Sequence, residues 1–415
     1  METIEQLLKD ASQAKQVIQP LSLETKRQVL ARLSSLLITN SNDIIAMNQK
    51  DLDRMDITDP KYDRLVLNKE RIEGLAQSVI DVSQLEDPTG KVLLTKQLAN
   101  GLYIEKKSVA LGVVGVIYES RPNVTIDVAA LCIQSGNVCL LRGGSDAWFT
   151  NSILVDLIHI VLREFDLDEH IVQLLPTDRK FVSELLTATR YVDIIIPRGS
   201  QSLIDLVRKN AKVPVIETGA GVCHTYVEET ANLEDAAQIV ANAKISRPSV
   251  CNSLDTILVD RKVSENFLHR VAPLLQEASV EIFADEDAFA TLASLNYPHL
   301  QQATESDYGR EFLDFKCSVK VIDNFQEALD HIAMYSSKHS ECIVSSNPDH
   351  ISAFMNVVDA AAVYSNASTR FTDGGEFGLG AEIGISTQKL HARGPFALEK
   401  LVTEKWFVTG NGQVR

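Results

Sequence analysis

The sequence has no hydrophobic run long enough to cross a membrane and no recognisable signal peptide. Spanning a bilayer takes roughly 18 to 20 consecutive apolar residues, and no stretch of the 415-residue chain reaches that length. The first residues, METIEQLLKDASQAKQ, have the spacing of an amphipathic helix and lack the apolar centre of a signal peptide. We therefore expect a cytoplasmic protein with no membrane partner.

Paired cysteines are also missing, and the 40 basic residues are fewer than the 56 acidic ones. The six cysteines form no CxxC motif, which argues against a disulfide framework and against a structural zinc site, so no metal is expected. A formal net charge of −16 repels phosphate backbones and excludes nucleic acid as a partner. By contrast, 415 residues of which 45% are hydrophobic suffice for more than one buried core. The composition indicates an acidic enzyme of two or more domains with reduced thiols.

The hydrophobic pattern changes along the chain. Over the first 90 residues apolar positions recur every three or four residues, which predicts a layer of helices. Apolar and polar residues then alternate on both sides of Asn100-Gly101, a dipeptide typical of tight hairpin turns. Short apolar runs separated by amphipathic stretches follow, and they predict the strands VALGVVGVIY, NVCLLRG, IVQLLP, YVDIIIPRG and VPVIET and, after residue 240, DTILVD, VKVID and ECIVSS. This order is typical of an α/β protein with doubly wound parallel sheets.

Glycines follow two of the predicted strands at the ends where ligands bind in such sheets. One strand ends in Arg142-Gly143-Gly144-Ser145 and another in Arg198-Gly199-Ser200, and the second is followed by a helical pattern. Helix N-termini at this edge present free N–H groups to phosphates, and glycine allows close approach of a ligand. No GxGxxG fingerprint is present, so these positions can equally be ordinary turn glycines.

Cys251 is the cysteine with the most polar local context. It lies among Ser249, Asn252 and Ser253 directly before a predicted strand, and Arg247 is four residues upstream. A nearby cation favours the reactive thiolate. A cysteine in a reduced protein is otherwise most often an inert core residue, and local context alone leaves both interpretations open.

A resemblance covers nearly the whole chain. The sequence is similar to the aldehyde dehydrogenase superfamily, and within it to reductases of acyl phosphates. The segments that carry it occur in the same order: GVIYESRPNVTIDVAALCIQSGN, LRGG, IIPRGSQSLI, VPVIETGAGVCH, RPSVCNSLDT, FTDGGEFGLGAEIGISTQKLHARGP and VTEKWFVTGNGQVR. The interval from Glu217 to Cys251 also resembles the base-to-nucleophile spacing of these enzymes.

The resemblance implies a domain organisation and a reaction. Residues 1–91 and 110–240 would form a nucleotide-binding domain, residues 241–380 a catalytic domain with Cys251, and residues 92–109 and 395–415 an oligomerisation flap. The implied reaction is the NADPH-dependent reduction of L-glutamyl 5-phosphate to L-glutamate 5-semialdehyde with release of phosphate, the second step of proline biosynthesis from glutamate. Cys251 would attack the acyl carbon to form a thioester, and hydride would reduce that thioester.

Catalytic roles follow from the same resemblance. Asn123 matches the superfamily's oxyanion-binding asparagine, although it could instead cap the helix that begins in this segment. Glu217 matches a glutamate that activates water in oxidising relatives. Because a reductase must keep water away from the thioester, we expect Glu217 to orient the nicotinamide, to relay a proton or to serve only the structure.

The implied cofactor-binding residues are Arg142, Gly143, Ser145, Gly199, Ser200 and Glu311. Glu311 matches a glutamate that binds the nicotinamide ribose, and the alternative is an exposed glutamate at a helix end. Arg142 could pair with the 2′-phosphate of NADPH. Related reductases commonly read LRGGK where this chain has Ser145 and Asp146, which leaves NADH as an alternative.

The expected substrate contacts are Arg121, Arg247 and Ser249, with ordinary surface ion pairs as the alternative for the arginines. The stretch 368–378 resembles a loop over the substrate entrance. The flap implies a homo-oligomer, a dimer or larger, unless it is an edge hairpin packed on its own domain. Glutamate 5-kinase is a further possible partner for substrate transfer.

Three other interpretations stay open. The chain could be an ordinary aldehyde dehydrogenase that uses water or a CoA-acylating relative. It could be the reductase half of a bifunctional synthetase, although no kinase-sized region precedes it. It could also be an inactive binding relative, which the joint presence of Cys251, Asn123 and Glu217 disfavours.

Overall fold

The computed structural model describes residues 3–59 and 62–415. The chain divides into two compact units, which are described separately. Unit 1 comprises the described residues up to Thr218 together with Gly378–Gly384 and Leu390–Arg415, and unit 2 comprises Gly219–Phe377 and Ile385–Lys389. Within the described ranges, no helix is both long and apolar enough to cross a membrane.

Unit 1 is built on a four-stranded parallel sheet whose order is β5-β4-β3-β6. The strands are β3 (Val113–Tyr118), β4 (Val138–Arg142), β5 (Val172–Leu174) and β6 (Ile194–Arg198). All six residues of β3 are buried, as expected for a central strand with both faces covered. Register pairs Ile117 with Arg142 and Tyr118 with Arg198, so the carboxyl ends of these strands lie along one edge.

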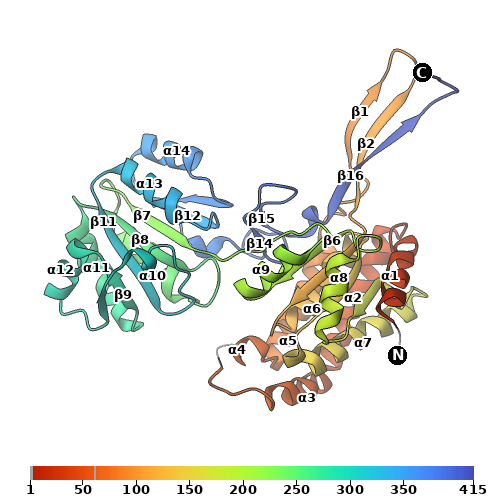
Figure 1. Ribbon diagram of the computed structural model, residues 1–415, viewed down its shortest axis with the longest axis horizontal. Coiled ribbons are helices and arrows are strands. Elements are labelled where there is room, and N and C mark those ends of the chain that lie inside the picture. Colours follow the sequence, from red (N-terminus) through yellow and green to blue (C-terminus); the bar gives the residue numbers. More distant parts are fainter. Residues whose placement is uncertain (1–2, 60–61) are drawn as a thin grey trace. The chain divides into compact units, whose positions relative to one another are not determined.

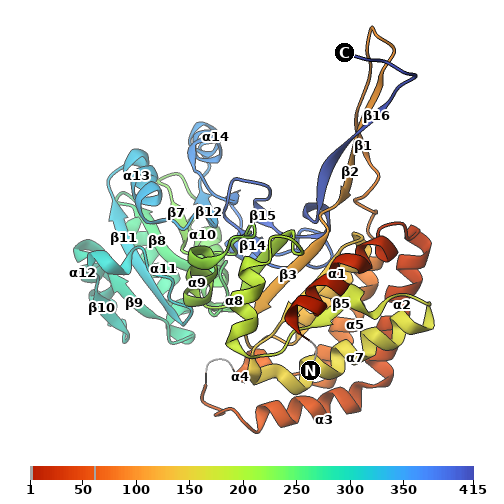
Figure 2. The same ribbon diagram turned by 45° about the vertical axis from the view of Figure 1, so that its right-hand side comes forward.

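The described residues of unit 1 form nine α-helices (Figure 1): α1 (Ile4–Ile18), α2 (Leu23–Thr39), α3 (Ser41–Leu52), α4 (Tyr62–Leu65), α5 (Lys69–Gln84), α6 (Asn123–Gln134), α7 (Trp148–Glu164), α8 (Arg179–Thr187) and α9 (Gln201–Asn210). Figure 2 shows α1 beside the strands, and α1 contacts β3, β4 and β5. Short 3-10 turns form η1 (Ser145–Ala147) and η2 (Glu169–Ile171). The early helical pattern of the sequence is confirmed.

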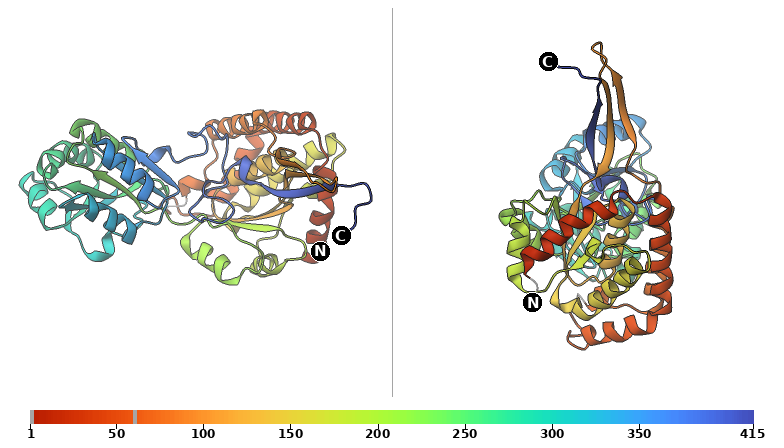
Figure 3. Two further views of the ribbon diagram at one scale, coloured as in Figure 1. Left: turned by 90° about the horizontal axis from the view of Figure 1, so that it is seen from above. Right: turned by 90° about the vertical axis from the view of Figure 1, so that its right-hand side faces the viewer.

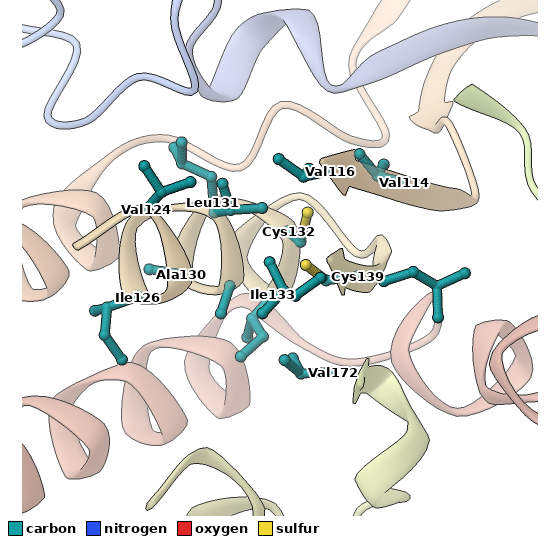
Figure 4. Packing of buried hydrophobic residues seen from close by; sticks show 14 of the residues in the cluster. Val114, Val116, Val124, Ile126, Ala130, Leu131, Cys132, Ile133, Cys139 and Val172 are labelled. Atoms are coloured by element: carbon teal, nitrogen blue, oxygen red, sulfur yellow. The ribbon is translucent and has the colours of Figure 1, made fainter. Parts of the chain in front are cut away.

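Helix α6 is apolar on nearly all sides because it lies inside unit 1. Figure 4 shows its side chains, Ile126, Leu131 and Ile133 among them, packed with residues of β3, β4 and β5. The side chains of Cys132 and Cys139 lie next to each other in this core. A helix that is hydrophobic all round must be buried, and ten of the twelve residues of α6 are buried here.

The predicted hairpin is part of a three-stranded antiparallel flap in unit 1. Strand β1 (Val92–Gln97) pairs with β2 (Tyr103–Ala110), and β2 pairs on its other side with β16 (Val402–Thr409). Gly101 has a φ of 91°, a left-handed value that glycine adopts without strain. The three strands lie side by side in the right-hand view of Figure 3. A short turn, η5 (Leu398–Lys400), precedes β16.

Unit 2 contains a seven-stranded parallel sheet of order β10-β9-β11-β8-β7-β12-β13. Its strands are β7 (Cys223–Val227), β8 (Leu254–Asp260), β9 (Glu281–Ala284), β10 (Leu300–Gln302), β11 (Lys316–Ile322), β12 (Ser340–Val344) and β13 (Ala362–Ser365). Its helices are α10 (Leu233–Ile245), α11 (Ser264–Glu277), α12 (Glu286–Ser294), α13 (Phe325–Tyr335) and α14 (Pro348–Val357), with the 3-10 turns η3 (Glu305–Asp307) and η4 (Thr369–Phe371).

Helices cover both faces of the unit 2 sheet. Val227, Ile257 and Val259 pack with α10, α11 and α12 on one face. Tyr226 and Leu258, their neighbours along the strands, pack with α13 and α14 on the other. Alternate residues of a strand point to opposite faces, so each strand contributes to both cores. The short segments β14 (Ile385–Ser386) and β15 (Gly394–Pro395) complete the elements.

Two predictions about this region differ from the structure. The first segment of unit 1 ends at Thr218, whereas the expected domain boundary was residue 240. The reason is β7, which begins at Cys223 and pairs with β8 and β12 of unit 2. The predicted strand VPVIET is also absent as a strand, because only Val215 forms an isolated bridge, with Ile195.

Candidate active site

Cys251 lies in the turn that connects α10 to β8 in unit 2. Helix α10 ends at Ile245, and Ser246 occupies its C-cap. The turn closes through a hydrogen bond from the Ser253 N–H to the Val250 carbonyl at 3.0 Å, and the Ser253 hydroxyl donates to the Ala243 carbonyl at 3.3 Å. The cysteine therefore follows a well-anchored helix and directly precedes a buried strand.

The backbone of Gly221 lies directly against the backbone of Cys251. A Cβ atom at position 221 would stand 1.6 Å from the Cys251 carbonyl oxygen, so no other residue fits without moving the cysteine. The thiol of Cys223 donates to the same oxygen at 3.3 Å. The segment before β7 thus fixes the position of Cys251.

Cys251 differs from the other five cysteines in its exposure. It is half-buried, whereas Cys132, Cys139, Cys223, Cys317 and Cys342 are buried. Burial raises the pKa of the Cys317 and Cys342 thiols to about 12 and raises the pKa of Cys139 and Cys223 as well. These thiols are protonated near neutral pH and poor nucleophiles.

Glu311 forms a hydrogen bond with the segment that positions Cys251. Its Oε1 accepts a hydrogen bond from the Gly221 N–H at 2.8 Å, and Gly221 in turn contacts Cys251. Glu311 lies in the connection between η3 and β11. The alternative of an exposed glutamate at a helix end is therefore wrong.

Arg247 and Ser249 lie in the same turn as Cys251. Arg247 is exposed and Ser249 half-buried. We find no ion pair of Arg247 within the described part of the chain, so the alternative of an ordinary surface ion pair is not supported for this arginine. Arg247 acts electrostatically on Arg370 of η4, a residue that the sequence analysis did not single out.

Asn123 is the first residue of α6 in unit 1. The N-cap position belongs to Pro122 and carries no side-chain cap, so the alternative role left open for Asn123, capping this helix, is wrong. The Asn123 amide instead donates to Asp127 Oδ2 at 3.1 Å. Burial raises the pKa of Asp127 to about 6, although Asn123, Ser78 and Arg198 oppose the shift.

Four of the predicted cofactor residues lie at the carboxyl edge of the unit 1 sheet. The Arg142 guanidinium donates to the Thr177 carbonyl at 2.5 Å. A Cβ atom at Gly143 would stand 2.3 Å from the side-chain nitrogen of the buried Asn151, so a larger residue there would force Asn151 to move. A Cβ atom at Gly199 would stand 2.7 Å from the Glu119 carboxylate. Ser200 caps α9, because its side chain accepts a hydrogen bond from the Leu203 N–H. The start of α9 therefore faces this edge.

Two acidic residues also lie at this edge. Glu119 accepts the Ser200 N–H at 2.9 Å. The carboxylate of Asp146, next to Ser145 in η1, accepts a hydrogen bond from the Ser120 hydroxyl. Burial lowers the pKa of Arg142, with Asp146 opposing and Arg179 reinforcing that effect. Burial and the nearby Arg179 thus lower the pKa of Arg142, whereas nearby acidic side chains raise it.

The two remaining predicted residues lie in unit 1. Glu217 is 3.7 Å from the Arg208 guanidinium of α9. Arg121 is half-buried in the connection between β3 and α6. Unit 2 brings together Cys251, Arg247, Ser249 and Glu311, and unit 1 contains Asn123, Glu217, Arg121 and the residues of the carboxyl edge.

Comparison with known proteins identifies the family. Residues 1–296 match the model of the aldehyde dehydrogenase family. A γ-glutamyl phosphate reductase of Chlorobaculum parvum is 51% identical over 100% of this chain and 99% of its own length. A γ-glutamyl phosphate reductase of Legionella pneumophila is 52% identical over 94% of each chain. The crystal structure of γ-glutamyl phosphate reductase from Thermotoga maritima matches with a TM-score of 0.94 and 39% identity over 100% of both chains.

The chain therefore belongs to the aldehyde dehydrogenase family, and it is an oxidoreductase with the α/β fold of that family. Within the family it groups with the γ-glutamyl phosphate reductases, because full-length identity near 50% relates it to proteins of that name. The resemblance inferred from the sequence motifs is confirmed.

Proposed function

We propose that the chain reduces L-glutamyl 5-phosphate to L-glutamate 5-semialdehyde with NADPH, as the second step of proline biosynthesis. The observation that carries the proposal is the full-length similarity to γ-glutamyl phosphate reductases, joined to a half-buried cysteine in a fixed turn. The competing interpretations, which use water or CoA to release the acyl group, have no comparable support.

The proposed chemistry begins with the Cys251 thiolate. Its sulfur forms a bond with the acyl carbon while the bond from that carbon to the phosphate oxygen breaks, and phosphate leaves with the electron pair. The resulting thioester accepts a hydride to give a tetrahedral oxyanion, which re-forms the C=O bond as the C–S bond breaks, so that the aldehyde leaves and the Cys251 thiolate is regenerated. The departing phosphate takes up the proton. One acyl phosphate, one reduced nicotinamide and one proton thus give one aldehyde, one phosphate and one oxidised nicotinamide.

Asn123 and Glu217 take supporting roles in the proposal. The Asn123 amide, together with the Cys251 N–H, would donate to the oxyanion that develops on the acyl oxygen. The contact with Asp127 supports this role, because it fixes the direction of the Asn123 side chain. Glu217 would orient the nicotinamide or relay a proton, since activation of water would waste the thioester.

The carboxyl edge of unit 1 suits a nicotinamide dinucleotide. A side chain at Gly143 would crowd Asn151 and one at Gly199 would crowd Glu119, so both positions keep the backbone open to a ligand. Helix α9 begins at Gln201, where first-turn N–H groups can face phosphate. Ser145 would contact the same end of the cofactor, and Arg142 would contact a 2′-phosphate. Glu311 would bind the nicotinamide ribose. NADPH supplies the hydride when it is bound.

The substrate is doubly charged, and the proposal assigns its anionic groups to Arg121 and Arg247, with Ser249 as a hydrogen-bond donor. Arg247 supports this assignment because it is exposed beside the nucleophile. Arg121 supports it because it is half-buried only two residues before Asn123.

A coupled assay tests the proposed function. Glutamate, ATP and a glutamate kinase supply the labile acyl phosphate, and nicotinamide oxidation is followed with NADPH and with NADH in turn. We expect turnover that requires the kinase and is faster with NADPH. The reverse reaction should require inorganic phosphate; oxidation of the semialdehyde with water or CoA and without phosphate would contradict the proposal.

A further inference from the structure

The guanidinium of Arg370 is fastened to both ends of the turn that carries Cys251. Its Nε donates to the Ser246 hydroxyl at 3.1 Å, and its Nη1 donates to Asn252 Oδ1. Ser246 ends α10, and Asn252 directly follows Cys251. The charged group therefore spans the turn beside the nucleophile.

Asn252 in turn forms hydrogen bonds with the segment that contains Arg370. Its side-chain amide donates to the main-chain carbonyls of Arg370 at 3.2 Å and Thr372 at 2.9 Å, and its main-chain carbonyl accepts from the Thr369 hydroxyl at 2.8 Å. Asn252 is only 3% exposed and Thr369 is fully buried. This reciprocal set leaves the guanidinium little freedom to move relative to the cysteine.

A second cation lies close to the first. Burial and the neighbouring Arg247 guanidinium lower the pKa of Arg370, whereas Asp373, Cys251 and Glu376 act in the opposite direction. Asp373 is engaged in its own loop, where its carboxylate accepts the N–H groups of Gly375 at 2.9 Å and Glu376 at 3.4 Å. Throughout the described ranges, neither arginine forms a salt bridge with a carboxylate. Two neighbouring cations are stabilised by an anion bound between them.

We propose that Arg370 and Arg247 bind the phosphate of the acyl phosphate beside Cys251. This inference rests on the proposed function and adds a residue to it. Planar guanidinium groups match phosphate oxygens with paired hydrogen bonds. When the C–S bond forms and the C–O bond to phosphate breaks, negative charge grows on the departing phosphate, and both cations stabilise it.

Protection of Cys251 from alkylation tests this inference without catalysis. The full-length protein is treated with iodoacetamide at constant ionic strength, with inorganic phosphate replacing chloride, and alkylation of Cys251 is followed by mass spectrometry. Phosphate should slow alkylation of the wild-type protein. In Arg370→Gln the phosphate concentration that gives half-protection should rise at least about tenfold, the effect of losing one charged contact.

Further variants separate a binding role from a structural one. Arg370→Lys should recover part of the protection because it keeps the charge, and Arg247→Gln should weaken protection although its side chain is exposed. Arg270→Gln, on α11, is the matched control and should behave like the wild type. Unchanged protection in both Arg370→Gln and Arg247→Gln would overturn the inference, as would a wild-type protein that phosphate does not protect.

The outcome is distinguishable from failure of the proposed function. Should phosphate protect Cys251 while the coupled assay shows no turnover, the phosphate site stands and the assigned reaction is wrong. Should the coupled assay show turnover that depends on phosphate in reverse but with the same phosphate KM in Arg370→Gln as in wild type, the reaction stands and the site is wrong.

Discussion

At the scale of single residues, the position of Cys251 depends on the absence of a side chain at Gly221. The cysteine carbonyl occupies the space that a Cβ atom would need. Gly221 lies in the family segment VPVIETGAGVCH, but the sequence alone gives no reason for this glycine. The reason is a contact between residues that are distant in the chain.

Replacing Gly221 with alanine should displace the nucleophile. We expect kcat/KM in the coupled assay to fall by about 10²-fold, as misplacement of a reacting group by about 1 Å can do, while cofactor binding is retained. The matched control is Gly219→Ala, where the nearest atom, Thr387 Oγ1, would lie at an ordinary 3.5 Å. Equal activity of the two variants would show that the Gly221 contact does not position Cys251.

The raised pKa of Asp127 predicts that the stability of the folded protein depends on pH. Because its pKa is raised to about 6 in the folded protein from an ordinary 3.8, the folded state retains a proton that the unfolded state has lost between these values. Its carboxyl group therefore costs stability as the pH rises from about 4 to 6, and that cost persists above pH 6.

Asp127→Asn removes this cost. The Tm of the variant relative to wild type should therefore rise between pH 4 and 6 and level off above, as measured by thermal unfolding across that range. A difference in Tm that is flat with pH would mean that Asp127 ionises normally in the folded protein.

At the scale of elements, hydrophobic periodicity predicted most strands and helices correctly because strands such as β3 and β8 are buried on both faces. It missed β7, whose sequence CHTYV mixes polar and apolar residues, although all five are buried. His224 Nδ1 in this strand forms a hydrogen bond with Glu341 of β12 at 3.0 Å, a contact that no local pattern reveals. Arg370 was missed for the same reason, since its role depends on contacts with Ser246 and Asn252.

The flap leads us to propose a homo-oligomer, a dimer or larger. Large apolar side chains are exposed on all three of its strands, among them Val92, Leu94, Tyr103, Trp406 and Val408. Exposed apolar strands mark interaction sites because they are costly to leave in water.

Light scattering after gel filtration measures the mass of the assembly. The wild-type protein should have at least twice the chain mass of 45.8 kDa, and Trp406→Glu with Val408→Glu should shift it toward the monomer. Lys405→Gln, on the same strand directly before Trp406, is the control. A wild-type mass near 46 kDa would refute the oligomer.

At the scale of the whole molecule, unit 1 carries the sheet edge that we propose binds the nucleotide, and unit 2 carries the turn with the proposed nucleophile Cys251. The family motifs predicted both the sheet edge and the nucleophile turn. This was possible because glycines and the ends of apolar strands can be recognised in a sequence. The residues that support them are less visible, because Asp127, Glu119 and Asn252 act through contacts that form only in the folded units.

The most direct test of the account replaces Cys251 with alanine and compares it with Cys317→Ala, a buried cysteine of β11. The coupled assay measures reduction of the acyl phosphate, and fluorescence titration measures NADPH binding. Cys251→Ala should lose at least about 10³-fold in kcat, as expected when a covalent nucleophile is removed, and should bind NADPH as the wild type does. Cys317→Ala should stay active. Wild-type turnover by Cys251→Ala would contradict the covalent mechanism.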